Sequence, residues 1–267
     1  MAVQIVWFKR DLRVADHAPL AEAAALGPVL PLFVLEPGLW REPDASARQQ
    51  AFMLECLGEL RDRLGELGQP LVVRTGAVEA VLEDLRQRLP VAALWSHQET
   101  GNAWTFARDR RVRAWATAHG IPWHERRQNG VIRGLQSRAG WAHRWERLIR
   151  AEAAPIPRRL VPVPGIDPGD LTPPVIADDP CPGRQSGGSD AGLALLASFL
   201  AERGLPYRAA MARPVAGAEH CSRVSPHLAW GTLSGIRATI GGGMSQNGIF
   251  WGARSGSAVD SAVSFDV

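Results

Sequence analysis

The chain has 267 residues, of which 46% are hydrophobic and 21% are charged. A chain of this length and composition can bury a substantial core, which excludes wholesale disorder and allows one large domain, or one domain and part of another. The formal net charge of +3 permits contact with nucleic acid but does not indicate it. An ordinary solvated surface explains the same charge.

The spacing of cysteine and histidine argues against disulfide and metal chemistry. The three cysteines, Cys56, Cys181 and Cys221, lie singly, without the paired spacing of a zinc site or a disulfide framework. The seven histidines form no HxxxH or HExxH pattern, so we expect no metal. The chain shows no signal-peptide pattern and no apolar run of ~18 residues. These features predict a cytoplasmic protein without membrane contact.

Residues 1–135 alternate between short apolar runs and amphipathic patterns. The apolar runs predict buried strands over Val3–Phe8, Pro28–Leu35, Leu71–Arg74 and Val91–Ser96. The amphipathic patterns predict helices over Ala18–Leu26, Ala47–Leu67, Val78–Leu89 and Asn102–His119. Strands of continuous apolar character that alternate with helices indicate an α/β fold with a Rossmann-like, doubly wound parallel sheet. Such a sheet has its ligand crevice at the carboxyl ends of its strands.

The composition changes after residue 135. Proline is dense over Ala153–Gly188, which predicts no regular secondary structure, and we interpret residues 136–189 as an interdomain connector. Residues 190–240 regain helical spacing and are interpreted as the incomplete start of an all-α domain. The tail, residues 241–267, is rich in Gly and Ser and has an aberrant composition for the end of such a domain.

An apolar stripe opens the second domain. Ser189 or Asp190 is a candidate N-cap for this helix. The stripe consists of Leu193, Leu196, Phe199 and Leu200.

The first strand leads into a loop of alternating charges. The motif runs Trp7-Phe8-Lys9-Arg10-Asp11-Leu12-Arg13 and continues to Asp16 and His17. Neighbouring Arg and Asp side chains can pair with each other and hold a strand-to-helix turn. We therefore favour a structural role over catalysis for these charges.

A second motif lies in the helical segment. Tyr207 is followed by Cys221-Ser222-Arg223-Val224-Ser225-Pro226 and then by Gly231-Thr232-Leu233-Ser234. A diphosphate is bound by hydroxyl donors, backbone N–H groups and a helix N-terminus. Ser222 and Ser225 supply hydroxyls, Pro226 is expected at the first position of a helix, and Gly231 allows close packing. A Ser-Pro helix start without a ligand is the alternative.

Together the two motifs resemble those of the DNA photolyase/cryptochrome family. The resemblance implies that residues 1–135 form the α/β antenna domain and that residues 190–240 begin the FAD-binding domain. It also implies an antenna chromophore of unknown identity, and damaged DNA as the partner of a monomeric intact relative. No catalytic residue is assigned. The cofactor-binding residues it implies are Tyr207, Cys221, Ser222, Arg223, Val224 and Ser225.

Two residues depart from the family pattern. Cys221 stands where Thr is common, which removes one hydroxyl from the FAD-binding motif. Met211 stands near the position where many photolyases have an Arg that contacts DNA, which puts that contact in doubt.

The function implied by the resemblance is FAD-dependent, light-driven repair of cyclobutane pyrimidine dimers. The alternatives are a cryptochrome-type photoreceptor without repair activity and a bare α/β nucleotide-binding-type domain. The resemblance stops near Gly235 to Ala238, before the rest of the family's FAD pocket. We therefore expect a C-terminally truncated, inactive chain that binds FAD poorly or not at all. We also expect it to leave the apolar face of Ala191–Leu200 exposed. The tail has the composition of out-of-frame translation or of a truncated gene model.

Overall fold

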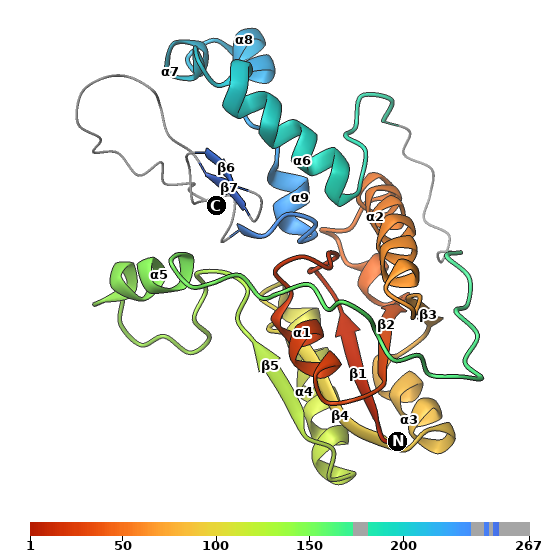
Figure 1. Ribbon diagram of the computed structural model, residues 1–267. Coiled ribbons are helices and arrows are strands. Elements are labelled where there is room, and N and C mark those ends of the chain that lie inside the picture. Colours follow the sequence, from red (N-terminus) through yellow and green to blue (C-terminus); the bar gives the residue numbers. More distant parts are fainter. Residues whose placement is uncertain (173–180, 236–242, 246–247, 251–267) are drawn as a thin grey trace.

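The computed structural model describes residues 1–172, 181–235, 243–245 and 248–250. Its centre is a five-stranded parallel sheet in the order β3-β2-β1-β4-β5 (Figure 1). This order and the parallel pairing confirm the predicted α/β class. The strands are β1 (Val3–Phe8), β2 (Val29–Leu35), β3 (Val72–Thr75), β4 (Val91–His97) and β5 (Trp123–Arg126).

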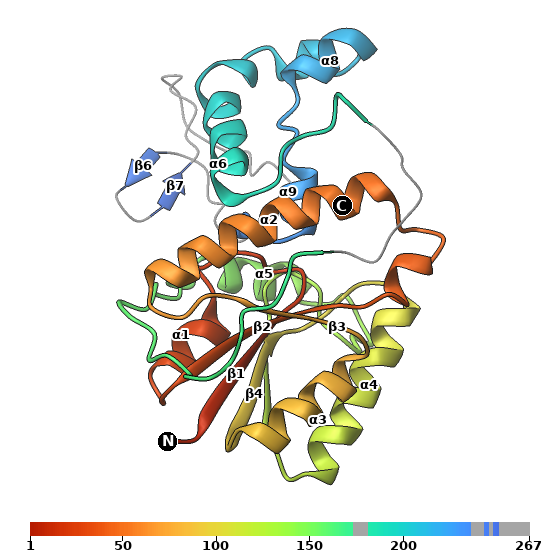
Figure 2. The ribbon, with the colours of Figure 1, turned by 90° about the vertical axis from the view of Figure 1, so that its right-hand side faces the viewer.

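Helices cover both faces of the sheet. Helices α1 and α2 pack on one face, and α3 and α4 pack on the other (Figure 2). The sheet is therefore doubly wound, as predicted from the alternating pattern. These helices span Ala18–Ala24 (α1), Ala47–Glu66 (α2), Val78–Arg88 (α3) and Ala103–Ala118 (α4).

Strand β1 explains why the two faces form one domain. All six of its residues are buried. Val6 and Phe8 pack with α1 and α2, while Ile5 and Trp7 pack with α3 and α4. Full burial of an apolar side chain contributes about 1.5–3 kcal/mol, so this strand stabilises both layers.

The remaining elements lie mostly beyond the sheet. Helix α5 and strand β5 were not predicted, whereas the described part of the Pro-rich segment 153–188 contains no helix or strand, as predicted. Two short antiparallel strands occupy part of the tail, and the rest of residues 241–267 lies outside the described residues. These elements are η1 (Leu39–Arg41), α5 (Trp141–Ile149), α6 (Ser189–Ser198), the π-helical turn η2 (Phe199–Arg203), α7 (Tyr207–Ala210), α8 (Pro214–His220), α9 (Ser225–Ala229), β6 (Gly243–Ser245) and β7 (Gly248–Phe250).

The start of α6 differs from the prediction. Gly188, with φ of 104°, is the N-cap residue, and neither Ser189 nor Asp190 caps the helix with its side chain. The carboxylate of Glu59 on α2 instead accepts from the N–H of Ser189 at 3.0 Å and from that of Asp190 at 3.4 Å. An acidic group is favourable there because it faces the positive end of the helix dipole.

The apolar face of α6 is also less exposed than expected. Leu196 is buried in a cluster with Val224 and Leu233, and Phe199 is buried as well. Leu193 is the member of the stripe that stays exposed, at 40%. The expectation that this face lacks partners is therefore wrong for most of the stripe, because the chain between α8 and residue 235 folds back onto it.

Among the helices of the described residues, none is both long enough and apolar enough to cross a membrane.

Candidate functional site

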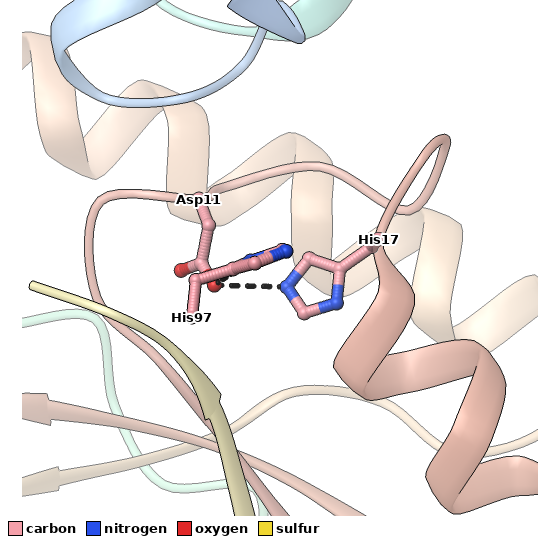
Figure 3. Close-up of side chains that lie close together, drawn as sticks. All are labelled: Asp11, His17 and His97. Atoms are coloured by element: carbon pink, nitrogen blue, oxygen red, sulfur yellow. Dashed lines mark hydrogen bonds and ion pairs between the residues drawn. The ribbon is translucent and has the colours of Figure 1, made fainter. Parts of the chain in front are cut away.

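The strand order reverses between β1 and β4, where doubly wound sheets place their ligand crevice. Here three buried side chains fill that place (Figure 3). Oδ2 of Asp11 lies 3.0 Å from Nε2 of His17 and 2.8 Å from Nδ1 of His97. The predicted crevice at this point of the sheet is therefore occupied by the chain itself.

This cluster corrects the prediction that the charges of the loop pair with each other. Asp11 pairs with the two histidines and also accepts from the N–H of Lys9 at 2.7 Å. Arg13 donates to the carbonyl oxygens of Ala15 at 3.1 Å and Asp16 at 3.0 Å. Asp11 and Arg13 therefore contact histidines and backbone groups rather than each other.

Asp11, His17 and His97 also have the composition of a metal site. The protonation of the cluster argues against that use. Nδ1 of His17 accepts from the N–H of Leu20 at 3.1 Å, so the neutral ring carries its proton on Nε2 and donates it to Asp11. A metal ligand needs a lone pair at that nitrogen, so the geometry describes hydrogen bonding.

The burial of the cluster shifts all three pKa values. Burial alone would raise the pKa of Asp11, but the hydrogen bonds from His17 and His97 outweigh it and hold the pKa well below its usual value. Burial lowers the pKa of His97 to about 3, helped by the neighbouring His17 ring. Burial likewise lowers the pKa of His17. The cluster is thus an ionised carboxylate held by two neutral imidazoles.

A narrow cleft lies beside this cluster, at the carboxyl ends of β1 and β2. The Trp7 indole is flanked by two cations, with Nζ of Lys9 at 4.6 Å and the Arg108 guanidinium at 4.7 Å from its ring centroid. Arg108 also donates to Glu36 at 2.9 Å and to Asp109 at 2.9 Å. The cleft therefore contains a buried network of both charge signs.

Two polar atoms of the cleft lack hydrogen-bond partners among the described residues. They are Nζ of Lys9, which lies 3.6 Å from Asp109, and Oε1 of Glu36. Burial raises the pKa of Glu36 to about 7, against the opposing charge of Arg108. The cavity volume is about 20 Å³, which holds about one water molecule. Trp40 and Trp230 also line the cleft, and their rings stack at 6.1 Å.

The residues of the second motif lie at the start of α9. Arg223 and Ser225 are exposed, Val224 is buried, and Cys221 and Ser222 are half-buried. Helix α9 begins at Ser225, so Pro226 is its second residue rather than its first. Arg223 has a left-handed φ of 59°.

One arginine that the sequence reasoning missed holds this motif. Arg203 donates to the carbonyl oxygens of Cys221 at 2.6 Å, Ser222 at 3.3 Å and Leu195 at 2.9 Å. The contacts use backbone carbonyls, so they leave the Ser222 hydroxyl unused. No sequence pattern marks Arg203, because its partners are main-chain atoms.

Tyr207 lies apart from the other five residues along the fold. It begins α7 with its side chain 36% exposed, and its ring meets that of Phe199 edge-on at 5.9 Å. Phe199 begins η2, the turn that also supplies Arg203. The structure thus links Tyr207 to the Cys221–Ser225 segment through η2, which contains both Phe199 and Arg203.

The chain after α9 returns to the loop that follows β1. We call residues Trp230–Ser234 the docking turn and residues Lys9–His17 the charged loop. The N–H of Leu12 donates to the carbonyl of Trp230 at 3.0 Å, and Arg13 donates to that of Gly231 at 2.9 Å. The Ser234 hydroxyl donates to Asp16 at 2.5 Å. The two sequence motifs are therefore in direct contact.

Comparison with protein families identifies the first part of the chain. Residues 4–135 match the family model described as DNA photolyase. The deoxyribodipyrimidine photo-lyase of Halobacterium salinarum is 32% identical, over 88% of this chain and 53% of the relative. The cryptochrome DASH of Gloeobacter violaceus is 29% identical, over 86% of this chain and 51% of the relative.

A solved structure is similar in fold. An archaeal photolyase from Sulfolobus tokodaii, described with two FAD molecules, aligns with a TM-score of 0.67 at 22% identity. The alignment covers 88% of this chain and 54% of that chain. At this identity the likeness shows the fold alone. The chain spans about half the length of the curated relatives it matches.

Proposed function

Because the chain belongs to the DNA photolyase/cryptochrome family, we propose that it is part of an FAD-dependent enzyme that repairs cyclobutane pyrimidine dimers in DNA with light. The observation that carries the proposal is the contact between the two motifs. The docking turn fixes the Cys221–Ser225 segment beside the α/β domain. Flavin held there would supply the electron for dimer cleavage, chemistry that belongs to the cofactor.

The donor set of the segment fits the phosphate part of FAD. The segment offers the exposed Arg223 and Ser225 side chains and the Ser222 hydroxyl, while Arg203 occupies backbone carbonyls that would repel an anion. We assign binding of the FAD diphosphate to Cys221, Ser222, Arg223, Val224 and Ser225, with Val224 anchoring the backbone through its burial. Tyr207 is assigned to the same site from its exposed position on α7.

We propose that this chain supplies one side of the site. The sequence spans about half of the relatives' length, so we propose that the remaining contacts to the flavin require residues beyond it. We therefore expect weak FAD binding and no repair activity from the 267 residues alone. DNA carrying a dimer is the proposed partner of the longer protein.

An antenna chromophore does not fit the cleft beside Trp7. Nζ of Lys9 and Oε1 of Glu36, which lack hydrogen-bond partners among the described residues, could bind a polar group, but a volume of about 20 Å³ admits no aromatic ring system. The stacked pair of Trp40 and Trp230 would have to open first. We therefore assign no antenna function to this cleft.

A titration with FAD tests the site. Quenching of flavin fluorescence should report weak binding to the chain, and replacement of both Arg223 and Ser225 by Ala should weaken it by at least tenfold, or about 1.4 kcal/mol. Arg110→Ala, on the exposed side of α4, is the control. A stoichiometric visible flavin spectrum from the purified chain would contradict the one-sided site.

A repair assay tests the activity. The gene should be read downstream of residue 235 in all frames, and the longest helical continuation should be expressed together with this sequence. The product should restore a dimer-containing oligonucleotide under visible light. Bound, photoreducible FAD without repair would instead favour a photoreceptor, which is the second candidate because a cryptochrome DASH is among the relatives. Absence of flavin would leave an α/β domain alone.

A further inference from the structure

Two motifs separated by more than two hundred positions share one interface in this fold. We propose that Arg13 and Gly231 are positioning residues, which hold the Cys221–Ser225 segment in place by docking Trp230–Ser234 onto the charged loop. The role in FAD binding rests on the proposed function. The docking itself rests on contacts within the chain.

Gly231 is the point of closest approach. Its φ is +66°, and a Cβ atom added there would lie 2.3 Å from the carbonyl oxygen of Arg10 and 2.6 Å from Cα of Asp11. Both neighbours are backbone atoms of the charged loop, which cannot move aside as a flexible side chain can. Any residue but glycine must therefore separate the docking turn from the loop.

Arg13 fixes the other side of the same contact. Its side chain is buried and donates to Gly231, to the carbonyls of Ala15 and Asp16, and to the side chain of Gln128 at 3.4 Å. Burial lowers the pKa of Arg13, opposed by the charges of Asp11 and Asp16, and the group stays charged at any ordinary pH. One planar guanidinium therefore fixes both the bend of the charged loop and the position of the docking turn against it.

Asp16 ties a third segment to the interface. Its φ of 51° is left-handed, a conformation that Asp tolerates better than most residues. One carboxylate oxygen accepts from Ser234, and the other accepts from the N–H of Ala154 in the connector at 3.1 Å. The charged loop is therefore the meeting point of the sheet, the connector and the docking turn.

Hydrogen bonds connect the docking turn to α9. Nδ1 of His227 lies 3.0 Å from the Thr232 hydroxyl, and the N–H of Leu233 donates to the carbonyl of His227. Val224 and Leu233 share the small cluster with Leu196. Since α9 spans Ser225–Ala229, displacement of the turn must also displace Ser225.

The test compares Gly231→Ala with Gly120→Ala. Gly120 has nearly the same φ, +64°, but nothing lies within 4 Å of its added Cβ, so this control carries the backbone strain without the clash. Hydrogen exchange of residues 221–229 is the first measurement. The near-ultraviolet circular dichroism of the stacked Trp40 and Trp230 is the second.

We expect Gly231→Ala to speed exchange over residues 221–229 at least tenfold, equivalent to about 1.4 kcal/mol, while amides of β1 and β4 keep their protection. The dichroic signal of the tryptophan pair should fall. Gly120→Ala should leave both unchanged. Unchanged exchange in Gly231→Ala, or an equal increase throughout β1 and β4, would overturn the docking role.

Arg13→Lys is the second variant, in case Gly231→Ala does not fold. Lysine keeps the charge but loses the fork, so exchange over residues 221–229 should rise by a smaller factor, and Arg13→Ala should raise it further. FAD affinity should follow the same order of variants. If the longer protein used in the repair assay shows no FAD affinity, the proposed function fails, whereas the exchange data on this chain still decide the docking role.

Discussion

The guanidinium of Arg203 donates to the carbonyl oxygen of Cys221 at 2.6 Å, across 18 positions of the chain. The same side chain also reaches Glu219, Ser222 and Leu195 through their carbonyl oxygens. One cation therefore holds the end of α6, the end of α8 and the start of the Cys221–Ser225 segment together.

Replacing Arg203 by Met should loosen the segment. A hydrogen bond to a charged group contributes about 1.5–3 kcal/mol, so we expect the free energy of unfolding of this part of the chain to fall by about 2 kcal/mol. Hydrogen exchange of residues 219–224 measures the change. The exposed Arg208→Met on α7 is the matched control, and an equal effect there would contradict the assigned contacts.

Glu59, a residue of α2, should act as the N-terminal cap of α6. Its carboxylate accepts from Ser189 and Asp190, and Arg63 holds it in place at 2.8 Å. Loss of a cap costs about 0.5–2 kcal/mol, so Glu59→Ala should fray the first turn of α6. Exchange of residues 189–192 is the measurement. Glu66→Ala, exposed on the same helix, should leave those amides protected.

The buried histidines should make the protein sensitive to acid. The unfolded His97 titrates near 6.5, while burial lowers its folded pKa to about 3. Between these values the unfolded state binds the proton and the folded state does not, so the free energy of unfolding falls as the pH drops. The slope from one such group is at most about 1.4 kcal/mol per pH unit.

His97→Asn tests this source of acid sensitivity, because the amide can still donate to Asp11 but does not titrate. Urea unfolding at pH 7 and pH 5 should show a smaller difference in the variant than in the wild type. His143→Asn, exposed on α5, should keep the full difference. If the wild type shows no loss of stability between pH 7 and pH 5, the assignment of a neutral His97 to the folded state is wrong.

The titration of Glu36 should change the stability in the opposite direction to that of His97, with a loss as the pH rises. Its folded pKa is raised from 4.5 to about 7, so the folded state keeps a proton that the unfolded state has lost. The free energy of unfolding therefore falls as the pH rises from 4.5 to 7. Glu36→Gln keeps an oxygen acceptor for Arg108 without the charge.

At pH 8 we expect Glu36→Gln to be more stable than the wild type by up to about 3 kcal/mol, with a smaller gain at pH 5. Urea midpoints at the two pH values measure this. Glu152→Gln, exposed in the connector, should change neither midpoint. A variant that is less stable than the wild type at pH 8 would show that ionised Glu36 is fully compensated by Arg108.

The sheet could be predicted because its strands bury both faces. Residues 3–8 and 29–35 are continuously apolar apart from Gln4 and Pro31, and such runs leave few alternatives between turn signals. Strand β5 was not predicted because its sequence, Trp-His-Glu-Arg, is polar and half-buried at the sheet edge. Helix α5 was not predicted, and none of its residues is buried.

The candidate site could be predicted only where its residues are neighbours in sequence. Cys221–Ser225 forms a contiguous motif, but its partner Arg203 contacts main-chain atoms that carry no residue signature. The pairing of Asp11 with His97 spans 86 positions and follows from the strand order, which periodicity does not specify. The cap by Glu59 likewise depends on how α2 crosses the start of α6.

The bond from Ser234 to Asp16 joins residues 218 positions apart. A ribosome that adds ~5–20 residues per second needs roughly 10–45 seconds to cover that interval. During synthesis the sheet can form while the charged loop still lacks the docking turn, and the Leu12 N–H and the Arg13 guanidinium that bond to the turn stay hydrated. The charged loop near the N-terminus can therefore complete its contacts only after the C-terminal half of the chain has been synthesised. A pause in translation before residue 230 would prolong the open state of a domain whose own residues are already complete.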